Sequence, residues 1–411
     1  MESLNVFLET DNSYSRVGLL SREGTSYYFE YDTEFLSSKV NSISIKLPKN
    51  NTFFEGLPVQ VFFENLLPEA EQRKIVASSI GISEGNFFGL LSRFGEECAG
   101  ALVITQREHF AKSDQGYAYL SESEFTDIIK KIETCTPATK HKGYRLSLAG
   151  AQAKFSVKIK GNEVSLPLND SPSTHLIKPF SRRFEALPVN EYFCTYLAKK
   201  AGLNTCNSEL FKYGTETVLS IERYDRIISE NSIARMHQED FCQALGFPYS
   251  MKYEEEGGPS FKQCLDLIIK ISAQPALDKQ QLIKWVIFNF LIGNADAHAK
   301  NISLLYRGHY NEKVTLAPFY DLVSTNIYEG LTKRFAMSIG EADYIDEMDE
   351  TSWEFFAKEC GIKTKTLYKY YSEINTAIKT AFKDISGAPY NEIKAVFKER
   401  SRMLRKWLKE I

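Results

Sequence analysis

Residues 285–305 read WVIFNFLIGNADAHAKNISLL, an apolar run that turns polar at 293–301 and then turns apolar again. The first part has the apolar content of a buried helix, and Gly293 is a typical residue for a helix end. Burying Asp296, His298 and Lys300 together is costly unless each side chain finds a partner. We therefore predict a helix that ends near Gly293, followed by a polar loop whose groups are held by neighbours or hold a ligand.

Length and composition set the broad class. The chain has 411 residues, 43% hydrophobic and 25% charged, so we expect a globular protein of two or three domains. A net charge of −3 argues against electrostatic nucleic-acid binding by the whole protein, while a local basic patch stays possible. The N-terminus lacks a secretory-signal pattern, and no apolar run approaches the roughly 18–20 residues that span a bilayer. Seven scattered cysteines without a C-x-x-C spacing disfavour a disulfide framework or zinc site, so we expect a cytoplasmic protein.

Strand-like and helix-like segments are segregated along the chain. The first 35 residues alternate like strands of a small antiparallel sheet, and a polar, irregular stretch at 106–122 indicates a domain boundary. Strand patterns dominate 144–226, whereas helical patterns dominate from 237 onward. This order predicts an α+β protein with a cleft between a β-rich and a helical lobe. The domain boundaries that we predict are 1–110, 111–235 and 236–411.

The individual elements follow from periodicity and from helix start and stop signals. Pro188 and Gly202 mark the start and the end of one helix especially clearly. The predicted helices are 58–81, closed by Gly81, then 84–95, 188–203, 238–246, 260–272, 279–293, 353–361 and a C-terminal helix. The predicted strands beyond the N-terminal sheet are 98–105, 144–150, 153–160, 174–180, 208–214 and 217–226.

The polar break contains a spacing that phosphoryl transfer requires. Asp296 and Asn301 form D-x-x-x-x-N, in which the Asp accepts a hydroxyl proton and the Asn ligates Mg²⁺ in kinases. Mg²⁺ needs a further oxygen ligand, and Asp321 follows Asn301 by twenty residues, after another short apolar strand. Lys178 lies within an apolar strand, where an ammonium group needs an anion such as a nucleotide phosphate. Each residue alone has an ordinary structural explanation, but together and in this order they favour a kinase.

No glycine-rich loop of the usual kinase pattern is present. The nearest substitute is SLAGAQAKF at 147–155, where Ala149, Gly150 and Ala151 would let backbone N–H groups approach phosphate and Lys154 would add charge. A plain hairpin turn built from small residues explains the segment equally well, so both interpretations stay open.

These segments resemble one known family, the HipA-type serine/threonine kinase toxins of bacterial type II toxin–antitoxin systems. The matching segments run in order over most of the chain, except near 106–140 and over the last 80 or so residues. They are FFENLLPEAEQR, CAGALVI, LSLAGAQAKFS, STHLIKP, NEYFCTYLAKKAGL, IERYDR, HQEDFCQALGFP, GNADAHAKN and LAPFYDLVS. The resemblance implies a protein-kinase-like two-lobed fold with a β-rich lobe, a large helical lobe and a small N-terminal β/α subdomain.

The resemblance also implies roles for individual residues. Asp296 would be the proton acceptor, Asn301 and Asp321 would hold Mg²⁺, and Lys178 would pair with ATP phosphate. Ser147 would be the position of autophosphorylation, a modification that silences the kinase. The remaining residues expected near ATP are Ala149, Gly150, Ala151, Gln152, Ala153 and Lys154 in the phosphate loop, Glu222, Arg223 and Tyr224 in the adenine hinge, and His298, Ala299, Lys300 and Tyr320.

Several positions allow two interpretations. Ala153 replaces the Glu that is common in the family, so any role of that acid is absent here. Glu191 either pairs with Lys178 or is a solvated acid at a helix start. Gln238 and Asp240 either line the cleft or belong to a helix N-terminus. The C-terminal helix carries seven Lys and Arg against two Glu from residue 394, which fits a solvated face or a contact with operator DNA.

The resemblance implies a growth-inhibiting toxin that phosphorylates a translation component such as an aminoacyl-tRNA synthetase. Its implied partner is a helix-turn-helix, HipB-like antitoxin that binds operator DNA. A small-molecule kinase is one alternative, because such enzymes also use D-x-x-x-x-N with a later Asp. A non-catalytic, antitoxin-bound corepressor is the other, although the intact set of kinase residues speaks against it.

Overall fold

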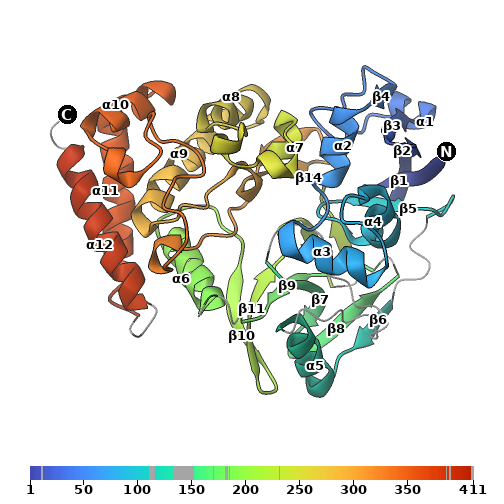
Figure 1. The fold of residues 1–411 in the computed structure, drawn as a ribbon, viewed down its shortest axis with the longest axis horizontal. Coiled ribbons are helices and arrows are strands. Elements are labelled where there is room, and N and C mark those ends of the chain that lie inside the picture. The colour runs from blue at the N-terminus through green and yellow to red at the C-terminus, as the bar shows by residue number, and fades with distance from the viewer. Residues whose placement is uncertain are drawn as a thin grey trace. The chain divides into compact units, whose positions relative to one another are not determined.

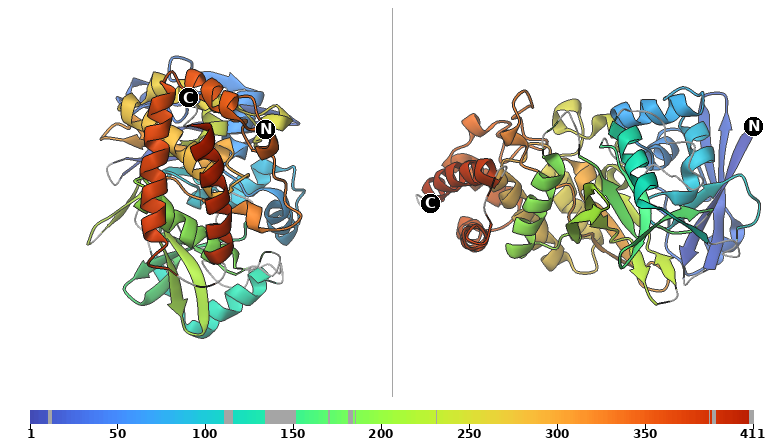
Figure 2. Two further views of the ribbon diagram at one scale, coloured as in Figure 1. Left: turned by 90° about the vertical axis from the view of Figure 1, so that its left-hand side faces the viewer. Right: turned by 90° about the horizontal axis from the view of Figure 1, so that it is seen from below.

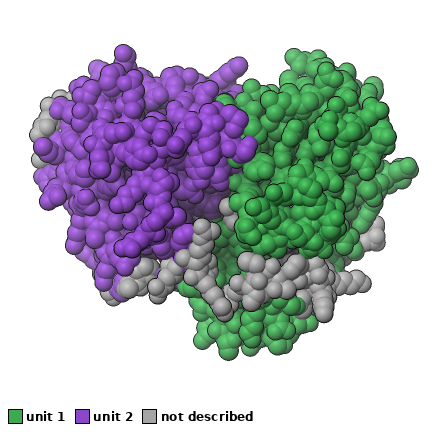
Figure 3. Space-filling model, viewed as in Figure 1, with its two compact units in different colours: residues 1–182, 207–249, 304–314 green, residues 183–206, 250–303, 315–411 purple. Residues whose placement is uncertain are grey.

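A computed structural model describes most of the chain in two compact units (Figure 3). The described residues are 1–10, 13–110, 116–133, 152–169, 171–180, 184, 186–230, 232–385, 387 and 390–408. Ser147, Ala149, Gly150 and Ala151, and with them the predicted strand at 144–150, lie outside this range. Unit 1 comprises residues 1–182, 207–249 and 304–314, and unit 2 comprises 183–206, 250–303 and 315–411. Each unit is therefore assembled from separate segments, and the three predicted domain boundaries stay a prediction.

The N-terminal part of unit 1 is a five-stranded antiparallel sheet, as predicted for the first 35 residues (Figures 1 and 2). The order β4-β3-β2-β1-β5 places β1 between β2 and β5. Short turns join β1 to β2 and β2 to β3, and Gly24 takes the left-handed conformation (φ 58°) between β2 and β3. The strands are β1 Glu2–Thr10, β2 Ser13–Glu23, β3 Ser26–Tyr31, β4 Phe53–Glu55 and β5 Leu102–Thr105.

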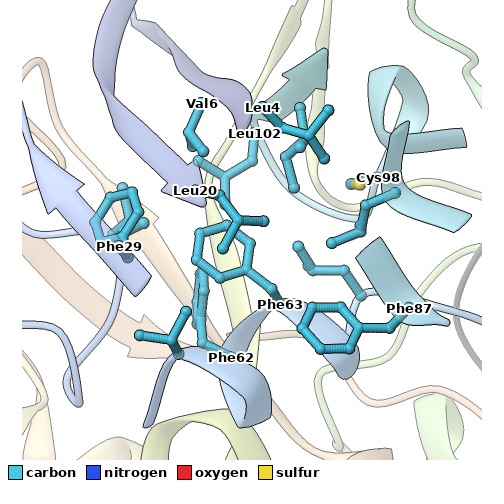
Figure 4. Close-up of a cluster of buried hydrophobic side chains, with 14 of the residues drawn as sticks. Leu4, Val6, Leu20, Phe29, Phe62, Phe63, Phe87, Cys98 and Leu102 are labelled. Atoms are coloured by element: carbon cyan, nitrogen blue, oxygen red, sulfur yellow. The ribbon is translucent and has the colours of Figure 1, made fainter. Parts of the chain in front are cut away.

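Helices close this sheet over a hydrophobic core (Figure 4). Strand residues such as Leu4, Leu20 and Phe29 meet Phe63 and Phe87 from the helices, and all five are buried. Alternation along the strands sends every second side chain to this face, so the core follows directly from the period-two pattern. The helices here are α1 Thr33–Ser37, α2 Leu57–Glu64, α3 Ala70–Ser79 and α4 Phe87–Phe94.

The single helix predicted at 58–81 is wrong, because the segment forms α2 and α3 with a break between them. Pro68 lacks an N–H group and disfavours helical backbone in the residue before it. The helix α3 then begins at Ala70, whose backbone is left-handed (φ 47°). Gly81 follows α3 with φ 70°, as expected of a residue that ends a helix.

The second sheet of unit 1 carries Lys178, the lysine that is predicted to pair with phosphate. Its order is β10-β11-β9-β7-β8-β6, so β9 lies between β11 and β7. Phe125 and Ile128 of α5 pack against Phe155 and Val164 of this sheet in a buried cluster. The strands are β6 Gly116–Tyr119, β7 Phe155–Lys160, β8 Glu163–Leu168, β9 His175–Lys178, β10 Ser208–Tyr213 and β11 Glu216–Glu222, and α5 is Glu122–Glu133.

Buried charges join the N-terminal subdomain to the segment that follows β11. The Glu97 carboxylate accepts from Arg223 at 2.8 Å, from Arg226 at 3.2 Å and from Arg235 at 2.9 Å. Asp225 adds a second acid, 2.8 Å from Arg223 and 3.0 Å from Arg226. All five side chains are buried, and the two arginines beside Asp225 hold the pKa of its carboxyl well below the usual range. Each buried charge in the cluster lies beside charges of opposite sign, which offset the cost of removing it from water.

The remaining elements of this region are short. A hairpin, β12 Arg226–Ile228 with β13 Ile233–Arg235, carries two of the clustered arginines. The strands β14 Gln238–Asp240, β15 Ser303–Arg307 and β16 Lys313–Leu316 form a three-stranded sheet, and α7 Phe241–Leu245 follows β14.

Two titratable residues near β14 contact the same loop of the N-terminal subdomain. The Glu239 carboxylate accepts from the Ser44 hydroxyl at 2.7 Å, from the Ile45 amide at 3.0 Å and from the Tyr306 hydroxyl. His237 Nε2 donates to the Ile43 carbonyl at 2.7 Å, because a carbonyl can only accept. Burial raises the pKa of Glu239 to about 7 and lowers the pKa of His237 to about 4.

These shifts predict opposing pH dependences of stability. From pH 4.5 to 7 the folded state binds more protons at Glu239 than the unfolded state, so this group lowers stability as pH rises. From pH 4 to 6.5 the unfolded state binds more protons at His237, so this group raises stability with pH.

The variant Glu239→Gln should remove only the pH dependence that comes from Glu239. Between pH 4.5 and 6.5 its unfolding free energy should gain about 2–3 kcal/mol relative to wild type, measured by urea unfolding. Parallel pH profiles would contradict the assignment.

Unit 2 is a helical assembly built around α9. The second half of α9 is buried on all sides, and α8, α11 and α12 pack against this helix (Figure 1). The Tyr371 hydroxyl of α11 donates to the Ser401 carbonyl of α12 at 2.8 Å, and the two helices run side by side. None of the helices that the structure describes is long and apolar enough to cross a membrane. The helices are α6 Leu187–Lys200, α8 Phe261–Ile271, α9 Pro275–Ile292, α10 Glu350–Glu359, α11 Thr364–Ala381 and α12 Tyr390–Trp407.

Candidate active site

The loop after α9 begins where the sequence predicts. α9 ends at Ile292, and Gly293 caps it in the left-handed conformation with φ 70°. Asn289, the one polar residue in the apolar end of the helix, donates to the Trp285 carbonyl at 2.9 Å. Its Oδ1 accepts from Asn294 at 2.8 Å, and Asn294 Oδ1 accepts from the Asp296 amide at 3.0 Å. A chain of buried amide groups therefore runs from the helix to the backbone of Asp296.

Two distant segments of unit 2 fix the residue before Asp296. The Ala295 amide donates to Thr325 Oγ1 at 2.8 Å, and the Thr325 hydroxyl donates to the Gly293 carbonyl at 3.2 Å. The Ala336 amide donates to the Ala295 carbonyl at 3.0 Å. The N–H and the C=O of Ala295 are therefore both hydrogen-bonded, which holds the backbone that leads into Asp296.

The loop then folds back on itself around the Asp296 carbonyl. That oxygen accepts from the His298 amide at 2.9 Å and from Asn301 Nδ2 at 2.8 Å. His298, Lys300 and Asn301 are buried, whereas the Asp296 side chain is 53% exposed. The arrangement presents the Asp296 carboxylate to solvent and, because Asn301 uses its amide nitrogen internally, leaves the Asn301 amide oxygen as the group that can ligate a cation.

The segment with Asp321 is tied to this loop through its neighbour. The Tyr320 hydroxyl donates to the Lys300 carbonyl at 2.7 Å and lies 2.7 Å from Ser303 Oγ. Asp321 itself adopts a left-handed backbone, φ 52°, which is uncommon outside glycine and concentrates at functional sites. An amide oxygen from Asn301 and a carboxylate from Asp321 are hard oxygen donors of the kind that Mg²⁺ takes beside phosphate oxygens. By donor type the two residues fit Mg²⁺, and their role as its ligands stays a prediction.

A small cavity lies beside the loop in unit 2. Its volume is about 30 Å³, which is enough for a water molecule. The lining residues are Phe261, Trp285, Val286, Asn289, Phe290, Asn294, Ala297, Phe335, Ala336, Met337, Ser338 and Ile339.

The predicted phosphate-binding lysines belong to unit 1. Lys178 ends β9 and is 2% exposed, and Lys154, just before β7, is 7% exposed. Gln152 and Ala153 are half-buried. For Glu191 the sequence allows a pairing with Lys178 or a solvated acid at a helix start. Glu191 is buried on α6 in unit 2, so the solvated interpretation is wrong, and the pairing stays a prediction.

The predicted adenine hinge lies at the end of β11. The amide N–H groups of Glu222 and Arg223 already donate to the carbonyls of Asn207 and Thr174, each at 2.9 Å. The Arg223 side chain belongs to the buried charge cluster, and the Tyr224 hydroxyl donates to Gln238. Hydrogen bonding of adenine by those two amides would break existing bonds, and the adenine-binding role of 222–224 stays a prediction.

Asp240 caps a helix N-terminus, which is one of the two interpretations that the sequence allows. Its carboxylate accepts from the Gln243 amide at 2.9 Å, and Gln243 Oε1 accepts from the Asp240 amide at 2.9 Å. This reciprocal capping box begins α7.

Family comparison covers both ends of this architecture. The HipA N-terminal domain matches residues 4–105, and the HipA-like C-terminal domain matches residues 146–382, more than half of the chain. The chain belongs to the HipA family.

Relatives within the HipA family are named as kinases. The putative kinase Y4mE of Sinorhizobium fredii is 40% identical, over 78% of this chain and 77% of its own length. The serine/threonine-protein kinase toxin HipA of Shewanella oneidensis is 34% identical, over 72% of this chain and 68% of its own. A solved structure of Shewanella oneidensis HipA, in a complex with HipB and operator DNA, matches with a TM-score of 0.81 and 26% identity over 99% of this chain and 97% of that one. This match confirms the predicted α+β, kinase-like fold.

Three contacting residues of the HipA-family loop are absent from the sequence-based prediction. Asn294 holds the Asp296 backbone, Thr325 holds Ala295, and the Tyr253 hydroxyl donates to Asp296 Oδ1 at 2.8 Å. Asn294 lies within the polar segment at 293–301, and this position could have identified it from the sequence. Thr325 and Tyr253 are distant in sequence and carry no motif, so only the fold reveals them.

Proposed function

We propose that this HipA-family chain is an ATP- and Mg²⁺-dependent serine/threonine protein kinase that acts in the cytoplasm as the toxin of a type II toxin–antitoxin system. The observation that carries the proposal is the loop in which an exposed Asp296 carboxylate and the Asn301 amide are fixed together, with the Asp321 segment tied to the same loop. Relatives named as kinases and as a kinase toxin support the same conclusion.

In the proposed reaction Asp296 accepts the proton of a substrate serine or threonine hydroxyl. The hydroxyl oxygen forms a bond to the γ-phosphorus while the bond between that phosphorus and the β–γ bridging oxygen breaks, leaving ADP. Asn301 and Asp321 would hold Mg²⁺, which when bound offsets charge on the phosphates. Lys178 pairs with phosphate, residues 149–154 cover it, and Glu222 to Tyr224 contact adenine. His298, Ala299, Lys300 and Tyr320 complete the nucleotide site.

The proposed substrate and partner rest on membership of the HipA family. We propose a translation component, such as an aminoacyl-tRNA synthetase, as the target, and a helix-turn-helix antitoxin of the HipB kind as the neutralising partner, with operator DNA bound through it. The operator complex of the Shewanella relative supports this assembly. Autophosphorylation at Ser147 would then switch the kinase off.

A phosphate-transfer assay tests the proposal. Purified protein with γ-labelled ATP and Mg²⁺ should label itself and a protein target, and chelation by EDTA should abolish the labelling because the phosphates lose their counter-charge. Expression without a neighbouring helix-turn-helix protein should arrest growth. Rapid labelling of a small alcohol without any protein acceptor would favour a small-molecule kinase, and no transfer to any acceptor would favour a corepressor.

A further inference from the structure

Tyr253 makes a direct contact with the proposed base that the reaction above does not use. Its hydroxyl donates to Asp296 Oδ1 at 2.8 Å, within unit 2. His298 Nε2 lies 3.9 Å from the same carboxylate oxygen, and the rings of Tyr253 and His298 meet edge to face at 5.3 Å. One oxygen of the carboxylate is thus engaged on the protein side.

Hydrogen bonds hold the segment that carries Tyr253. The Glu254 amide donates to the Ala336 carbonyl at 3.0 Å, and the Ala336 amide donates to the Ala295 carbonyl at 3.0 Å. The Glu254 carboxylate also accepts from the Ser338 amide at 2.7 Å. A continuous set of hydrogen bonds therefore connects the residue after Tyr253 to the residue before Asp296.

A glycine closes the same segment. The Gly258 amide donates to the Tyr253 carbonyl at 3.0 Å, and a Cβ at position 258 would overlap the carbonyl oxygens of Met251 and Tyr253. The backbone packs too closely here for any other residue. Such closely packed backbone suits a residue that stays in place during the reaction better than one that must move away before the substrate binds.

The Asp296 carboxylate needs such a support. The backbone on both sides of it is anchored by Asn294, Ala336 and Asn301, but its side chain is 53% exposed. Backbone anchors place the Cβ atom, while rotation of the carboxylate stays open until one of its oxygens is bonded. A general base must present a defined oxygen to the hydroxyl, at about 2.6–3.2 Å.

We propose that Tyr253 is a positioning residue for the phosphate transfer proposed above for Asp296, and the inference rests on that proposed function. The phenol hydroxyl holds Oδ1, which turns Oδ2 toward the substrate hydroxyl. The substrate proton then passes to Oδ2 while Oδ1 keeps its bond to Tyr253.

Tyr253→Phe tests the inference. Loss of one hydrogen bond to a charged group should lower kcat of phosphate transfer about 10-fold to 100-fold, while the KM for ATP changes less than about twofold. Tyr368→Phe, which removes a phenol hydroxyl from α11 of the same unit, serves as the control and should keep wild-type kcat. Melting temperatures of both variants report whether the fold is intact.

A second pair of variants keeps the test decisive if Tyr253→Phe unfolds. Tyr253→Gln retains an N–H donor and Tyr253→Leu has none, so the glutamine variant should be at least about threefold more active. A Tyr253→Phe kcat within twofold of wild type, a rise in kcat, or equal activity of the second pair would overturn the inference. Absence of phosphate transfer by the wild-type protein would instead overturn the proposed function itself.

Discussion

Asp296→Asn should lower phosphate transfer by about a hundredfold to ten-thousandfold, because the amide cannot accept the substrate proton. The fold should survive, since the side chain is half-exposed and an asparagine oxygen can still accept from Tyr253. Autophosphorylation and growth arrest should both disappear. Transfer of γ-labelled phosphate and colony formation after induction measure the two effects.

The control for this variant is a carboxylate of unit 2 outside the loop. Asp266→Asn removes an exposed acid that pairs with Lys262 on the surface of α8, and it should leave phosphate transfer unchanged. ATP binding by Asp296→Asn should also persist, because neither Asn301 nor Asp321 is altered. A fully toxic Asp296→Asn variant would refute the assignment of the base.

Glu97→Gln should destabilise unit 1 by about 3–5 kcal/mol, since it removes one partner from a buried cluster of charges. Arg223, Arg226 and Arg235 all direct guanidinium groups at this carboxylate, and the Ser173 hydroxyl donates to it at 2.7 Å. A neutral amide would leave a buried positive excess and would turn an N–H group toward guanidinium donors. The midpoint of denaturant-induced unfolding, at unchanged slope, measures the loss.

The neighbouring acid provides a matched control. Glu96 pairs at 3.3 Å with Arg107, whose side chain is 49% exposed. Solvent screens this pair, so Glu96→Gln should cost less than about 1 kcal/mol. Similar losses from Glu96→Gln and Glu97→Gln would contradict a special role for the buried cluster.

Elements with a strong local pattern could be predicted from the sequence. The N-terminal sheet, the helix that ends at Gly293 and the helix that starts near Pro188 follow period-two or period-3.6 patterns and local start and stop signals. The continuous helix at 58–81 failed because apolar periodicity runs through Pro68, whose local effect on the backbone is stronger than the pattern. The helix α5 went unpredicted although Phe125, Ile128 and Ile129 have helical spacing, because the surrounding stretch is polar.

The candidate site divides in the same way. The spacing of Asp296 and Asn301 is a local feature of the sequence, and so is the later Asp321. In so short a loop the Asn301 side chain can reach the Asp296 backbone, as it does in the structure. The bond from Tyr253 to Asp296 and the support of Ala295 by Thr325 and Ala336 join residues that are 30 or more positions apart in the chain. Their contributing segments carry no motif, so no local pattern predicts them.

The sequence by itself determined the end of the apolar helix and the class of the fold and predicted the candidate catalytic groups, because each depends on residue types and short spacings. Only the tertiary structure decided how those groups are held. Glu97 gathers three arginines, Glu239 and His237 share one loop, and Tyr253 fixes one oxygen of Asp296. Each of these contacts arises when packing brings distant segments together, and the polar groups that become buried at Glu97, Glu239 and His237 must then find partners.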